Sequence, residues 1–109
     1  MKIEFIPEAL EYFNELSTIL YEKDYFGFRE SALKYVDDLL EDIKTNLPVK
    51  LKKPAPSYFE RYGKNMLYST FRKNKATQWY VFFNVYQRDE ETIFLIRYIS
   101  NNHVAAEHL

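Results

Sequence analysis

The feature that most constrains the fold is a set of three runs rich in β-branched and aromatic residues, at residues 66–72, 77–86 and 92–99. Short polar segments, residues 73–76 and 87–91, separate these runs. Such a pattern is typical of consecutive antiparallel strands. The middle run is apolar at both alternating sets of positions, so we expect a central strand that is covered on at least one side.

The pattern of apolar residues in the first half of the chain predicts two helices that cover this sheet. Residues 7–20 open with a proline and early acids, which suit a helix N-terminus, and their apolar residues are spaced three to four apart. Residues 24–27 break the pattern, and residues 28–47 then repeat it up to Pro48. The sequence therefore predicts a hairpin of two amphipathic helices. The residues expected to face the sheet are Leu10, Phe13, Leu16 or Ser17, Leu20, Phe28, Ala32, Tyr35, Val36, Leu39, Leu40, Ile43 and Leu47.

The remaining segments complete one predicted domain over residues 1–109. Residues 2–6 alternate as a short edge strand, and residues 49–57, with two prolines, read as a linker. Residues 58–62 form either a short strand or part of a loop, and residues 103–109 form a short tail. The predicted fold is α+β: an N-terminal strand and a two-helix hairpin packed on a curved, mainly antiparallel sheet of about four strands.

Composition narrows the class of protein. With 47% hydrophobic and 18% aromatic residues, a chain of 109 residues is large enough to bury a core and is not typical of disorder. The absence of cysteine excludes disulfides and thiolate metal sites. No apolar run approaches the roughly 20 residues that span a bilayer, and residues 1–6 are too short and acidic for a signal peptide. We expect a cytoplasmic protein with no membrane partner and no cofactor.

The net charge of −1 hides an uneven distribution of charge. Residues 1–46 hold 5 bases and 11 acids, a net charge of −6, whereas the rest holds 10 bases and 5 acids, a net charge of +5. Between Lys50 and Lys75, eight bases stand against Glu60 alone. This split favours one face that meets an anion; the alternative is ordinary surface charge that maintains solubility.

Taken together, the arrangement resembles toxins of the RelE/ParE superfamily, from bacterial type II toxin–antitoxin systems, over nearly the whole chain. The likeness rests on the proline-bearing link and on four segments: the end of the helical hairpin (Asp-Leu-Leu-Glu-Asp-Ile, 38–43) and the strand runs Tyr-Ser-Thr-Phe-Arg (68–72), Trp-Tyr-Val-Phe-Phe (79–83) and Phe-Leu-Ile-Arg-Tyr-Ile (94–99).

The resemblance implies a growth-inhibiting toxin but leaves its target open. RelE-like members are endoribonucleases that cut messenger RNA in the ribosome, whereas ParE-like members inhibit DNA gyrase. Both are neutralised by a cognate antitoxin, which we expect here to be acidic and amphipathic and to cover the helical hairpin or the basic sheet face. A third reading is a non-catalytic binding module of this fold without toxicity.

The residues of the RelE-like nuclease pattern are largely replaced in this chain. In that pattern, basic residues along the sheet and after the last strand, together with a C-terminal tyrosine, promote attack of a 2′-hydroxyl on the adjacent phosphate. Tyr68 and Thr70 stand where lysine is expected, and Tyr80 stands at or near the expected arginine. Asn101 and Asn102 replace a common basic pair, and no tyrosine follows the last strand.

The remaining basic residues define the candidate site. The catalytic candidates are Arg72, whose planar fork suits a phosphate, Lys75, and His103, which can carry a proton at neutral pH. Alternatively, Arg72 pairs with a carboxylate and His103 is a surface or capping residue. The candidates for nucleic-acid or target binding are Lys50, Lys52, Lys53, Arg61, Lys64, Lys73 and Arg97.

Several of these residues also have a structural interpretation. Arg97 is predicted to lie on the same side of its strand as Leu95 and Ile99. An arginine among apolar neighbours is more often a structural residue with a bonding partner than a binding residue. Asn101 and Asn102 are typical of a turn or a helix cap. The three linker lysines either follow a nucleic-acid backbone or are simply solvated, and most aromatic residues are expected to be core.

Metal binding has little support in the sequence. His103 and His108 are five residues apart with Glu107 beside one of them, and no further ligands cluster nearby. We expect no metal site.

Overall fold

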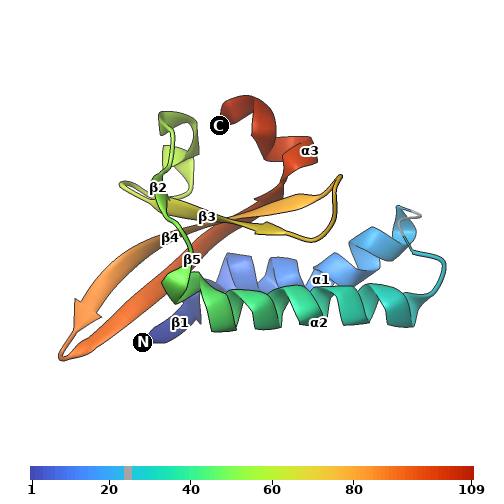
Figure 1. Cartoon of the computed structure of the whole chain (residues 1–109), viewed down its shortest axis with the longest axis horizontal. Helices are drawn as coiled ribbons and strands as arrows, with labels where there is room; N and C mark the ends of the chain where they lie inside the picture. The colour runs from blue at the N-terminus through green and yellow to red at the C-terminus, as the bar shows by residue number, and fades with distance from the viewer. Residues whose placement is uncertain (24–25) are drawn as a thin grey trace.

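A computed structural model describes residues 1–23 and 26–109 of the chain. The predicted break between the helices falls partly on residues 24 and 25, which lie outside this described part. The elements shown in Figure 1 are, in chain order, β1 (Lys2–Phe5), α1 (Pro7–Glu22), α2 (Arg29–Asn46), η1 (Leu47–Val49), β2 (Lys53–Pro54), η2 (Ser57–Arg61), β3 (Leu67–Arg72), β4 (Gln78–Arg88), β5 (Glu91–Asn101), α3 (Asn102–Ala105) and η3 (Ala106–His108), where η marks a single 3₁₀ turn.

The sheet is mixed and has five strands in the order β1-β5-β4-β3-β2. β1 runs parallel to β5, and every other pair is antiparallel. The prediction of an α+β fold is confirmed, but the expected number of about four strands is wrong. The proline-bearing linker contributes β2, in which Lys53 lies opposite Tyr68. Pro54 fits there because an edge strand can do without one backbone donor.

The helices α1 and α2 lie side by side on one face of the sheet (Figure 1). Most of the predicted stripe is buried there, but Leu10 is 46% and Phe28 is 72% exposed, so these two assignments are wrong. Ala9 takes the inward position in the first turn of α1, and Phe28 precedes the first turn of α2. None of the described helices combines the length and apolarity needed to cross a bilayer.

The second face of the sheet is also covered, by η2 and the C-terminal tail (Figure 1). Residues 57–61 form a 3₁₀ turn rather than a strand, and Phe59 stacks on Phe82 of β4 at 4.4 Å between ring centroids. Tyr58 stacks on His108 of the tail at 3.6 Å. The central strand β4 is therefore covered on both sides, which satisfies the expectation from its composition.

A bulge in β5 changes which residues share a face. Ile96 and Tyr98 pair with consecutive residues of β4, which leaves Arg97 as the extra residue. After the bulge, Ile99 joins the core beneath the helices together with Ile96. The predicted alternation of Arg97 with Ile99 is therefore wrong, because the inserted residue shifts the phase of the strand.

Candidate functional site

The turn between β3 and β4 is fixed by its own hydrogen bonds. The amide nitrogen of Lys73 donates to the carbonyl oxygen of Thr77 at 3.0 Å. Within the turn, Oδ1 of Asn74 accepts from the amides of Ala76 and Thr77, both at 2.8 Å. An asparagine that closes such a turn on its own backbone fixes the loop without help from the core. Arg72 and Lys75 therefore leave the sheet from a defined position.

Two asparagines bring the C-terminal segment to this turn. Oδ1 of Asn102 accepts from the amide of Gln78 at 3.0 Å, and its Nδ2 donates to the carbonyl of Ala76 at 3.1 Å. Oδ1 of Asn101 accepts from the amide of His103 at 3.0 Å, so the predicted capping role is confirmed for Asn101, whereas the Asn102 side chain bonds across to the turn. These bonds position His103 beside a turn that lies 26 to 30 residues earlier in the sequence.

Two adjacent pockets open at this end of the sheet, with volumes of about 310 and 240 Å³. They share Asn74 and Thr77, so only the turn separates them. The larger one, called the aromatic pocket below, is lined by Leu20, Phe26, Tyr35, Asn74, Thr77, Trp79, Asn101 and His103. The smaller one, called the basic pocket, is lined by Arg72, Asn74, Lys75, Ala76, Thr77, Gln78, Tyr80 and Asn102.

The site has cations, and none of the described acidic side chains lines it. Nε of Arg72 donates to the carbonyl of Asn74 at 3.1 Å, which leaves the Nη atoms of its guanidinium available. Within residues 1–23 and 26–109, no ion pair involves Arg72, Lys75 or His103, and no acid lines either pocket. The carboxylate partner considered for Arg72 is thus not found among these residues. An anion entering the basic pocket would meet uncompensated positive charge.

The aromatic pocket has a fixed neutral floor. Nε1 of Trp79 donates to the hydroxyl of Tyr35 at 2.9 Å. Burial raises the pKa of Tyr35, and the hydrogen bond with Trp79 opposes that rise, so the phenol stays neutral at physiological pH. Nζ of Lys73 lies 5.2 Å from the centroid of the Tyr35 ring, a cation–π contact.

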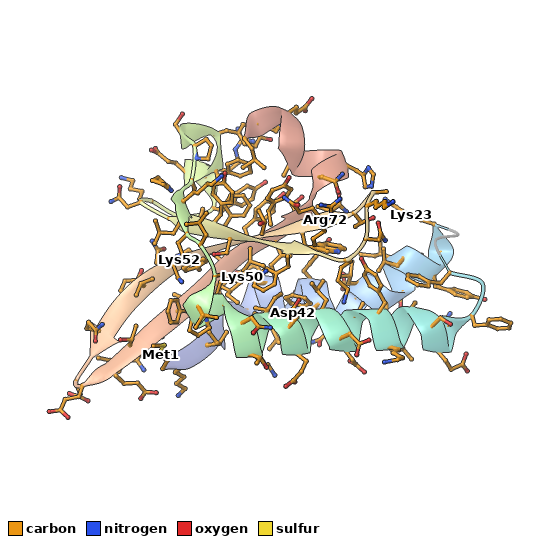
Figure 2. All side chains as sticks on the ribbon, in the orientation of Figure 1. Met1, Lys23, Asp42, Lys50, Lys52 and Arg72 are labelled. Atoms are coloured by element: carbon orange, nitrogen blue, oxygen red, sulfur yellow. The ribbon has the colours of Figure 1, made fainter. Side chains whose placement is uncertain are left out.

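The linker lysines form a second group, away from this site. Nζ of Lys50 lies 4.7 Å from the centroid of the Phe71 ring, and Nζ of Lys52 donates to two backbone carbonyls at 2.8 and 3.0 Å. Lys53 is exposed on the edge strand β2. Figure 2 shows Lys50 and Lys52 separated from Arg72 along the sheet.

The other three predicted binding residues lie over the second face. Nε of Arg61 donates to the carbonyl of Tyr58 at 3.2 Å, and its guanidinium covers the Tyr58 ring. Arg97 donates to Oδ1 of Asn84 and to a tyrosine hydroxyl, while Nδ2 of Asn84 donates to the carbonyl of Lys64. The ten predicted residues therefore form three groups rather than one continuous basic face.

His103 and His108 lie in different surroundings. His103 lines the aromatic pocket, whereas Nε2 of His108 lies 3.1 Å from Oε1 of Glu107 and its ring stacks on Tyr58. In the described part of the chain, no three His, Asp or Glu side chains gather in a way that would hold a metal ion.

Sequence reasoning did not identify Asn74, Thr77, Tyr35 and Trp79 as site residues. The first two stand in a segment that reads only as a turn. Tyr35 and Trp79 stand at core spacing, which does not reveal that they also line a pocket. A weak signal was present in the asparagine of a lysine-rich turn, because this residue often fixes a loop locally.

Comparison of the chain with protein-family models, with curated proteins and with solved structures finds no match.

Proposed function

We propose that this chain is a growth-inhibiting toxin of the RelE/ParE superfamily, and that it acts on RNA through the two pockets at the end of the sheet. The order of elements supports this proposal: a strand, a hairpin of helices on one face, then three antiparallel strands. The observation that carries it is the pair of adjacent pockets at one polar turn, one lined by Arg72 and Lys75 and the other by His103. No acid among the described residues lines either pocket. Such a site suits a phosphate group on which negative charge develops in a transition state.

The chemistry proposed is ribosome-dependent cleavage of messenger RNA. The 2′-oxygen forms a bond to the adjacent phosphorus as the bond from phosphorus to the 5′-oxygen breaks. The neutral imidazole of His103 accepts the proton of the 2′-hydroxyl, and the ammonium of Lys75 donates a proton to the leaving 5′-oxygen. The guanidinium of Arg72 stabilises the charge that develops on the non-bridging oxygens.

A second candidate function is non-catalytic binding, either inhibition of DNA gyrase or capture of a partner without toxicity. The observation favouring it lies on the second face. Tyr68, Thr70 and Tyr80 occupy positions where RelE-like members carry basic side chains, and Tyr80 is buried in the cluster that holds Phe59 and Ala105. A protein or DNA target would then be held by the same basic turn, with no proton transfer.

In either case the proposed resting partner is a cognate antitoxin. An acidic amphipathic segment has charge complementary to the cluster at Arg72 and Lys75.

Inducible expression of the chain in bacterial cells tests the proposal. We expect growth to stop and ribosome-bound messenger RNA to be cut at defined codon positions. Growth arrest with intact messenger and an induced DNA-damage response would favour gyrase inhibition. Normal growth at a verified protein level would contradict both toxin readings and favour the partner-binding module.

The variants Arg72→Ala and His103→Ala separate catalysis from binding. Losing one group that stabilises the transition state lowers a rate by about 100-fold or more, so either variant should abolish RNA cutting. His103→Ala should leave gyrase inhibition largely intact, because no proton transfer is needed there. Arg88→Ala is the matched control, since Arg88 is exposed at the other end of β4.

A further inference from the structure

We propose that the aromatic pocket binds an unpaired nucleobase while the basic pocket holds the phosphate of the same nucleotide. The site would thus bind one nucleotide of a single strand, with its base in one pocket and its phosphate in the other. This inference rests on the proposed function, because it names the part of the RNA that the same site recognises.

The floor of the aromatic pocket suits the flat face of a base. It combines side chains from α1, α2, β4 and the segment before α2, and the rings of Phe26 and Tyr35 are tilted against each other at 5.2 Å. Both rings are half-buried, so each keeps an exposed part, and Trp79 closes the floor beneath them. Unstacked bases in single strands are recognised by stacking on such side chains. A volume of about 310 Å³ suits one small planar group rather than a large ligand.

The rim of the aromatic pocket carries hydrogen-bonding groups whose orientation is fixed. Oδ1 of Asn74 and Oδ1 of Asn101 each accept a backbone amide, which determines where the amide groups point. No hydrogen bond between described residues uses the Nδ2 atoms of these asparagines, the Thr77 hydroxyl or the His103 ring. A purely apolar pocket would not need this rim, whereas the edge of a base presents several donors and acceptors.

The basic pocket lies where the phosphate of that nucleotide would have to be. Asn74 and Thr77 line both pockets, so a ligand in one contacts the wall of the other. Arg72 and Lys75 supply two cations on the basic side. A base and its phosphate are joined through one sugar, which matches two pockets divided by a single turn.

Trp79 provides a direct readout because it is the only tryptophan in the chain. We would titrate the full chain with a single-stranded RNA tetramer and follow Trp79 fluorescence. A tetramer with the same backbone but abasic residues has the same phosphates without bases. We expect the normal tetramer to change the emission and to bind about tenfold or more tighter than the abasic one, since stacking of one base contributes that much. Equal affinities for the two tetramers would overturn the inference.

A variant that fills the aromatic pocket gives a second, independent test. Thr77→Phe should remove the preference for the normal tetramer over the abasic one, because the new ring occupies the space that the base would take. Thr45→Phe, on the exposed side of α2, is the matched control and should behave like the original chain. Circular dichroism verifies that both variants fold. A preference that survives in folded Thr77→Phe would overturn the inference.

The two proposals fail in different ways. If expression of the chain arrests growth and cuts messenger RNA but the tetramers bind equally, the proposed function stands and the base pocket is wrong. If the tetramers differ but the chain neither arrests growth nor cuts RNA, the pocket stands as a nucleotide site and the toxin proposal is wrong.

Discussion

At the scale of residues, the aromatic side chains have roles that the sequence pattern does not separate. Tyr35 and Trp79 were predicted as core by their spacing, and Trp79 is indeed only 1% exposed. Both also line a pocket, and their mutual hydrogen bond fixes its floor. A buried aromatic residue has the same spacing in the sequence whether or not it also lines a pocket. The sequence therefore predicts the core role of Tyr35 and Trp79 but not their place in the pocket.

Tyr12 gives a prediction at this scale. Burial, and secondarily the charge of a neighbouring Tyr98, raises its pKa from 10.0 to about 12. The unfolded chain therefore loses the Tyr12 proton first as pH rises. Since the unfolded state then binds fewer protons than the folded state, the free energy of unfolding falls between pH 10 and 12.

The variant Tyr12→Phe should remove part of this pH dependence. Urea unfolding at pH 8 and pH 11 measures it: we expect the midpoint of the original chain to drop more between the two pH values than that of the variant. Both chains should unfold similarly at pH 8, where the phenol is neutral in the folded and unfolded states. An identical drop in the two chains would contradict the assignment.

At the scale of elements, periodicity predicted the helical hairpin and the three long strands, because each must bury one apolar face. It failed where tertiary contacts decide. The strand β2 lies in a proline-bearing linker, and it forms because Ser69 donates to the carbonyl of Leu51 and the amide of Ala55 donates to Met66. The bulge at Arg97 has no composition signal of its own, so the alternation of β5 was extended one residue too far.

The two leucines Leu39 and Leu33 of α2 test the assigned core face. Leu39 is fully buried, and Leu33 is 47% exposed on the same helix. Leu39→Ala should lower the free energy of unfolding by about 2–5 kcal/mol, because it removes buried methyl groups and leaves a cavity. Leu33→Ala should change it by less than about 0.5 kcal/mol. Chemical denaturation measures both, and equal losses would mean that α2 packs through a different face.

At the scale of the whole molecule, the charge split between the two halves of the chain does not predict how the basic residues are arranged. The predicted basic residues form three groups. One of these groups lies next to His103, because Asn102 ties the C-terminal segment to the turn at residues 73–77. This contact joins segments that are distant in the sequence, so the sequence pattern does not predict it. The sequence showed the asparagines and the cations but not that they meet.

The central claim, that this turn is where the protein acts, is tested most directly by growth arrest with charge-removing double variants. Arg72→Ala/Lys75→Ala removes both cations of the basic pocket, and Lys44→Ala/Arg88→Ala removes two exposed cations elsewhere. With equal protein levels and verified folding, we predict that cells expressing the first double variant grow normally, while cells expressing the second stop growing like those with the original chain. Growth arrest by the first variant as strong as that by the original chain would contradict the claim.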